Sequence, residues 1–168
     1  METHILGEQG NRHLMRSVVR PRAPGPPEHL HLGFEEHFRV VEGKLHVPVN
    51  GHVHIAGPGE AVRVPPHAPH KFFNPTDSPA VYELEVPRDY ALFLSQVYKF
   101  TNDYPPPTHR LKYILQISRL RPDAWLPRPP LPVQRVLFFF IEPTARLLGY
   151  QRYYRSYVPQ LPVTAPRV

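Results

Sequence analysis

The sequence predicts a mainly β domain followed by a helical extension. The first half of the chain contains short runs of alternating apolar and polar residues separated by glycine and proline turns, a pattern typical of antiparallel strands. After Pro87 the apolar residues instead recur every three or four positions, the period of an amphipathic helix. The 24 prolines among 168 residues disfavour long uninterrupted helices. We therefore expect a β domain over residues 1–87 and a Pro-rich helical extension over residues 88–168.

Two segments of the β domain carry the clearest strand pattern. Residues 12–20 predict a strand that enters the domain, and the prolines after it predict a rim loop. Residues 81–86 alternate strictly, so Tyr82 and Leu84 share one face of a strand and two glutamates share the other. We expect Tyr82 and Leu84 to point into the core.

Residues 44–56 predict a hairpin, and two registers fit its length. A two-residue turn at Asn50-Gly51 pairs valines with histidines, whereas a three-residue loop pairs apolar residues with each other, for example Val47 with Val53. We expect the three-residue loop, because register usually follows the hydrophobic pattern. This register puts three histidines on the outer face, where we expect solvation or an interface rather than a second metal site: His46, His52 and His54.

The extension begins with two expected helices and a connector. The first helix follows a cap at Asp89, and its apolar side chains recur at helical spacing: Tyr90, Phe93, Leu94, Val97 and Tyr98. The second covers about residues 108–120. A Pro-rich connector over residues 121–132 holds Trp125, the only tryptophan.

A third helix is expected over about residues 133–148. Pro143 lies inside it and predicts a kink or a stop near Ile141. Gly149 predicts the C-terminal end of the helix.

The residues with metal-binding chemistry lie between positions 29 and 74. His29 and His31 leave a strand on the same side, because successive side chains alternate between faces. Glu36 begins a second strand and points the same way as the apolar residues after it. His70 follows a strand and a Pro-rich bend and is the natural fourth ligand. Three imidazoles and one carboxylate suit one divalent transition metal, namely Fe, Mn, Ni, Cu or Zn, rather than Ca or Mg.

The spacing of these residues resembles the two motifs of the cupin superfamily. The first reads His29-x-His31-x4-Glu36-x6-Gly43, and the second runs from Gly59 to Asn74 through His70. The resemblance covers roughly residues 10–87 and implies a jelly-roll barrel, the cupin-type double-stranded β-helix. It also implies that the metal lies inside one end of the barrel, held by His29, His31, Glu36 and His70. The alternative is a barrel without metal in which these residues form a polar pocket.

The sequence departs from the cupin pattern at two positions. His67 stands where the family usually has glycine, and the glycine expected before the first histidine is displaced to Gly25. Glu35 competes with Glu36 for the carboxylate position. The spacing to Gly43 favours Glu36, so we expect Glu35 to point outward.

Around the metal we expect an apolar pocket lined by the inward residues of the strands: Phe38, Val40, Phe72, Tyr82 and Leu84. For a small barrel these residues are equally well plain core. The candidates for a general base or acid are His67, near the mouth of the barrel, and Tyr82, inside it.

Composition restricts the compartment and the partners. The sequence has no cysteine, which excludes disulfides and thiolate chemistry. We read no secretory signal at the N-terminus and no apolar run of membrane-spanning length, so we expect a soluble cytoplasmic protein. Residues 1–87 hold 8 Lys/Arg against 10 Asp/Glu, a balance of −2, whereas residues 88–168 hold 12 against 4, or +8.

The basic, aromatic tail allows three interpretations. It packs on the barrel or on a second subunit, it contacts a membrane surface through arginines that flank bulky apolar groups, or it binds nucleic acid. We expect the first, keep peripheral membrane contact as an alternative, and expect no nucleic acid, because no recognised binding module is visible. The resemblance to cupins also implies a homodimer.

Two functions remain open at this point. The first is a metal-dependent enzyme, of oxygenase or isomerase type, acting on a small oxygen-bearing substrate. The second is a non-catalytic module in which the metal anchors a ligand and the tail contacts a partner or a membrane. An enzyme predicts polar groups within reach of the substrate, whereas a module predicts a nearly apolar cavity and an exposed apolar tail surface.

Overall fold

A computed structural model describes residues 2–103, 110–120 and 123–150. Its strands are β1 (Glu2–Gln9), β2 (Arg12–Val19), β3 (Glu36–Glu42), β4 (Leu45–Val49), β5 (His52–Ala56), β6 (Ala61–Val64) and β7 (Ala80–Pro87). The helices are α1 (Arg88–Asp103), α2 (Arg110–Leu120) and α3 (Leu131–Leu147). The change from strands to helices falls at the position that the sequence predicted.

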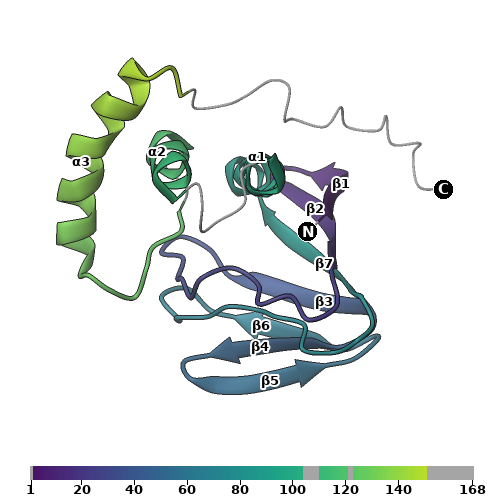
Figure 1. Ribbon diagram of the computed structural model, residues 1–168. Helices are drawn as coiled ribbons and strands as arrows, with labels where there is room; N and C mark the ends of the chain where they lie inside the picture. The colour runs from purple at the N-terminus through teal and green to yellow at the C-terminus, as the bar shows by residue number, and fades with distance from the viewer. Residues whose placement is uncertain (1, 104–109, 121–122, 151–168) are drawn as a thin grey trace.

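The strands form two facing sheets. The first sheet has five antiparallel strands in the order β1-β2-β7-β3-β6. The second consists of β4 and β5 and is continued by single β-bridges from Val49 to His70 and from His70 to His29. The strand order and the facing of the two sheets match the predicted jelly-roll (Figure 1), although the described strands do not close into a continuous hydrogen-bonded cylinder.

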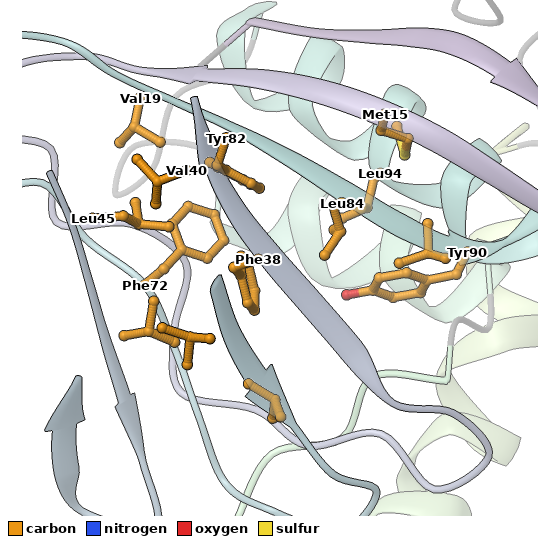
Figure 2. Packing of buried hydrophobic residues seen from close by; sticks show 14 of the residues in the cluster. Met15, Val19, Phe38, Val40, Leu45, Phe72, Tyr82, Leu84, Tyr90 and Leu94 are labelled. Carbon is orange, nitrogen blue, oxygen red and sulfur yellow. The ribbon is translucent and has the colours of Figure 1, made fainter. Parts of the chain in front are cut away.

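The core lies between the two sheets. Figure 2 shows Phe38, Val40, Leu45, Phe72 and Tyr82 packed together there. The Phe38 ring lies 5.4 Å from that of Tyr82 and 5.5 Å from that of Phe72, between centroids. The predicted inward orientation of Tyr82 and Leu84 is confirmed, because both are buried.

The predicted register of the β4–β5 hairpin is wrong. Val47 pairs with His54 rather than with Val53, across a two-residue turn at Asn50-Gly51. Both turn residues have positive φ, 51° and 82°, as the turn type favoured by Asn-Gly requires. The turn sets the register here because β5 is largely exposed and gains little from burying its valine.

The corrected register also separates the three hairpin histidines. His52 and His54 pair with inward residues of β4, whereas His46 pairs with Ile55 and lies on the opposite face. A second metal site formed by these three histidines is therefore excluded by the geometry.

Two further elements differ from expectation. β1 was not predicted. It is an edge strand, and among its residues whose burial is described Ile5 is the one that belongs to the hydrophobic core. Helix α3 does not stop near Ile141, as one of the two predicted outcomes would have it, but continues through Pro143 to Leu147. The carbonyl that Pro143 leaves without a partner belongs to Phe139, which is exposed, so water can bind it. Gly149, with φ 82°, follows the helix as predicted.

The helices cover one end of the β domain (Figure 1). Helix α1 packs against β1, β2 and β7, and α2 lies between α1 and α3. Arg119 of α2 fastens α3, because it donates to the Tyr150 carbonyl at 2.8 Å and pairs with Glu142. Helix α1 thus packs on the β domain and α3 packs on α2. Which partner the tail contacts stays a prediction, and the tyrosines beyond Tyr150 lie outside the described residues.

Asn74 closes the loop that leads into β7. Its buried side-chain amide donates to the carbonyls of Val19, Arg20 and Ser78, at 3.3, 3.2 and 2.8 Å. Its carbonyl oxygen accepts from the backbone and hydroxyl of Thr76, at 3.0 and 2.7 Å. A shorter side chain would remove these hydrogen bonds and leave the Ser78 carbonyl only the one from the Thr76 hydroxyl.

We expect Asn74→Ala to lower the free energy of unfolding by about 3 kcal/mol, since several buried polar groups lose their hydrogen bonds. Urea denaturation measures the change. Asn11→Ala, at an exposed position, is the control and should change stability by less than about 0.5 kcal/mol. Equal stability of the two variants would show that the Asn74 network does not support the fold.

Candidate metal centre and adjoining cavity

Four predicted ligands come together at one end of the β domain. One ligand atom from each of His29, His31, Glu36 and His70 lies within 4.8 Å of every other. Among the described residues, this is the one group of acidic and histidine side chains arranged to hold a metal. His31, Glu36 and His70 are buried, and His29 is partly buried.

Backbone pairing places the histidines. His29 and His70 lie directly opposite each other, because each donates its amide to the carbonyl of the other at 2.8 Å. His31 follows two residues after His29 and therefore lies on the same face. Its carbonyl accepts the amide of His67 at 2.7 Å, which fixes the segment. Glu36 projects from the start of β3 toward the three imidazoles.

Each histidine is held by a backbone carbonyl through Nδ1. The acceptors are Pro27 for His29 at 2.9 Å, Ala68 for His70 at 2.9 Å, and Asp123 for His31. A carbonyl oxygen can only accept a hydrogen bond, so Nδ1 is the protonated donor in all three rings. The Nε2 atoms are then free to bind a metal, as in most histidine-ligated sites.

The Nε2 atoms face the Glu36 carboxylate. Glu36 Oε2 lies 2.8 Å from Nε2 of His70 and 3.4 Å from Nε2 of His31. The buried Nε2 of His31 makes no hydrogen bond. A carboxylate and unprotonated imidazole nitrogens repel each other at these distances unless a positive charge lies between them.

The pKa directions indicate that the Glu36 carboxyl is ionised. Burial opposes ionisation of Glu36, but the neighbouring His31 and His70 hold the pKa of its carboxyl well below the usual value. Burial also disfavours a proton on His31, yet Glu36 raises the pKa of His31. Burial and the neighbouring His70 lower the pKa of His29 to about 4. The donor set and its net negative charge therefore fit a divalent transition metal.

The two glutamates are separated as expected. Glu36 belongs to the cluster, whereas Glu35 lies outside it, where it pairs with His37 and lies 3.6 Å from Arg63. Adjacent residues of a strand point to opposite faces, which explains the difference.

A cavity of about 370 Å³ adjoins the metal centre, and His29 and Glu36 form part of its wall. Of its 22 lining residues, 6 come from the β domain and 16 from the helical extension. Phe72 and Leu84 line the cavity as predicted, whereas Phe38 and Val40 belong to the core behind it.

The two predicted catalytic residues do not line this cavity. His67 is exposed, with φ 65°, and Tyr82 is fully buried between Phe38 and Phe72. Burial also raises the pKa of Tyr82, which prevents it from acting as a base near neutral pH. Catalytic roles for His67 and Tyr82 stay predictions from the sequence that the cavity geometry does not support.

Sequence reasoning missed two contributors from the extension. Tyr90 of α1 lines the cavity, and its ring contacts that of His31 at 4.7 Å between centroids. Asp123 holds the His31 segment, because its carbonyl binds the imidazole and its carboxylate accepts the amides of Leu32 and Gly33, the latter at 2.7 Å. The helical stripe pointed to a buried Tyr90, but a backbone carbonyl leaves no signal in the sequence.

The fold and the site agree with the family comparison. A model described as the cupin domain matches residues 15–87. Residues 15–87 therefore form a cupin domain. No curated protein matches the chain. No helix among the described residues is long and apolar enough to cross a membrane.

Several solved structures are similar over the cupin domain. A cupin-2 domain protein from Shewanella frigidimarina is 20% identical over 52% of this chain and 80% of its own, with a TM-score of 0.46. The polyketide cyclase RemF from Streptomyces resistomycificus is 24% identical over 51% of this chain and 63% of its own, with a TM-score of 0.46. A cupin sugar phosphate isomerase from Silicibacter pomeroyi is 26% identical over 45% and 50%, with a TM-score of 0.42.

We expect the double variant His29→Ala/His70→Ala to lose the metal, because it removes two of four ligands. Elemental analysis of protein purified without added metal or chelator measures the content. The control His52→Ala/His54→Ala removes two exposed histidines and should keep the metal. Near-stoichiometric Fe, Mn, Ni, Cu or Zn in both double variants would place the site elsewhere.

Asp123→Ala should weaken metal binding about 10- to 100-fold, the usual effect of losing support behind a metal ligand. The expected cause is movement of the 31–33 segment once its two amides lose their acceptor. Competition with a chelator of known affinity measures the constant. Asp77→Ala, which breaks an exposed pair with Arg22, is the control; an identical affinity in both variants would contradict the role of Asp123.

Proposed function

We propose that this protein is a divalent-metal-dependent enzyme acting on a small oxygen-bearing substrate. The observation that carries the proposal is that two members of the four-residue cluster that could hold a metal, His29 and Glu36, form part of the wall of a cavity. A metal held only for structural stability is normally enclosed by protein ligands, whereas a catalytic metal keeps a position open to substrate.

A divalent ion bound by these residues would supply Lewis-acid polarisation of a substrate oxygen or activation of water or dioxygen. The chain itself supplies positioning. The β-bridge between His29 and His70 fixes two ligands, and the apolar lining excludes water from the substrate.

Tyr90 is the polar side chain best placed to assist. It lines the cavity beside His31, and burial raises the pKa of its hydroxyl well above the ordinary value. The hydroxyl therefore stays protonated near neutral pH and can donate a hydrogen bond, or a proton, to a substrate oxygen.

A non-catalytic binding module is the second candidate, and two observations favour it. The cavity lining is almost wholly apolar, and α3 exposes large apolar side chains, with Phe139 and Phe140 exposed by 69% and 68%. Arg135 and Arg146 lie on the same helix, as the predicted contact with a membrane surface would require. The homodimer that the sequence analysis predicted stays a prediction.

Metal-loaded protein should convert at least one compound in a small-molecule extract of bacterial cells. Liquid chromatography with mass spectrometry over time detects the conversion as a new mass or, for an isomerisation, as a new retention time at the same mass. The change should disappear in His29→Ala/His70→Ala. Tyr90→Phe should slow it at least about tenfold while leaving the metal content unchanged, because only the hydroxyl is removed.

The exposed variant Leu111→Ala is the matched control for Tyr90→Phe and should react at the rate of the unmodified protein. Compounds that bind to the metal-loaded protein but are never altered would overturn the enzyme proposal in favour of the binding module.

A further inference from the structure

The cavity beside the candidate metal centre has ionisable acid and imidazole groups at one end and a mainly apolar wall elsewhere. Its only acid and imidazole groups are His29 and Glu36, both at the metal centre, and no lysine or arginine of the described chain lines it. The rest of the wall is aliphatic and aromatic apart from three tyrosines, one glutamine and the indole of Trp125.

The glutamine and the indole are already engaged within the protein. Gln134 donates to the carbonyls of Leu126 and Pro129, at 2.8 and 2.6 Å, and accepts the Leu126 amide at 3.1 Å. The Trp125 indole donates to the Asp123 carboxylate at 3.1 Å. These residues present mainly their apolar surfaces to the cavity.

A heavily hydroxylated or phosphorylated ligand would fit this wall poorly. Each buried polar group of a ligand costs free energy unless it finds a hydrogen-bond partner, and a phosphate needs cationic or amide donors that the lining lacks. An apolar ligand body meets no such cost, and its burial is favourable in proportion to its area.

We propose that the cavity binds an amphipathic molecule whose apolar body lies among the helices and whose single oxygen-bearing head group lies at the His29–Glu36 end. This inference deepens the proposed function and rests on it for the head group, which would bind the metal. The volume of about 370 Å³ lies within the range of pockets for ligands of drug size.

The half of the site that takes the apolar body is built by the extension. Ile117 of α2, Val97 of α1 and Leu137 of α3 contribute to its wall, together with Leu126 of the connector. Leu126 and Leu137 are also about half exposed, at 48% and 49%, so the connector and α3 mark the side from which a ligand enters.

Trp125 provides a direct readout, because it is the only tryptophan of the chain and lines the cavity. The probe is ω-bromoundecanoate, a carboxylate with an apolar chain whose bromine quenches indole fluorescence. The protein is loaded with zinc, which has no redox chemistry of its own. We expect saturable quenching that undecanoate reverses by competition and propionate does not.

A matched pair on α2 tests the location. Ile117→Phe narrows the cavity and should weaken binding of the probe at least about tenfold, whereas Leu111→Phe, at a position 69% exposed, should leave it unchanged. Val97→Phe repeats the test from α1. Thermal unfolding and zinc content of each variant show that the fold and the metal centre are intact.

The outcomes separate this inference from the proposed function. Zinc binding without saturable quenching, or equal quenching in Ile117→Phe, Val97→Phe and Leu111→Phe, would overturn the amphipathic ligand and leave the metal site standing. Saturable quenching that Ile117→Phe weakens, in a protein that takes up no metal, would uphold the apolar site and overturn the metal-dependent function. Tighter binding of the probe with zinc than without it supports both.

Discussion

A buried carboxylate surrounded by three imidazoles is the constraint on which this structure depends. Glu36 is 2% exposed, and its partners His31 and His70 are equally buried. Burying such a group is unfavourable unless charges and hydrogen bonds compensate one another. Every imidazole Nδ1 has a backbone carbonyl as its hydrogen-bond partner. The atoms left for another partner are the three Nε2 atoms and the Glu36 carboxylate, which lie close together. A site organised in this way is better suited to hold a cation than to serve as a polar pocket without metal.

The extension is part of the site rather than an appendage. Trp125 forms a β-bridge with Leu30, and Asp123 supplies the carbonyl that orients His31. The helices on either side of this segment supply most of the cavity wall. The cupin domain therefore provides the four candidate metal ligands, and the extension provides both the support for His31 and most of the wall of the adjoining cavity.

The sequence predicted the local part of this arrangement well. Alternation along a strand brought His29 and His31 to one face, and the same rule separated Glu36 from Glu35, because both depend on neighbours in the chain. The strands and helices with a clear apolar period were predicted correctly for the same reason. β1 was missed because an edge strand with one core residue carries almost no pattern.

The remaining errors concern interactions that the hydrophobic pattern does not encode. At the β4–β5 hairpin, the conformation of Asn50-Gly51 outweighed the pairing of apolar residues. Tyr82 points inward, as predicted. Tyr90 rather than Tyr82 lines the cavity, however, because the helices pack against this end of the β domain. The contact between Asp123 and His31 joins residues 92 positions apart through a backbone atom, so no residue type could have indicated it.

The position of Asp123 has a thermodynamic consequence. The short connector that supports His31 also carries Trp125 and Leu126, which line the cavity, and Leu126 is bonded in turn to Gln134 of α3. A ligand that orders this connector lowers the entropic cost of fixing His31, and a metal that fixes His31 orders the connector for the ligand. If the protein binds a metal and a ligand as proposed, the two binding events would share one coupling free energy, and each would strengthen the other by the same factor.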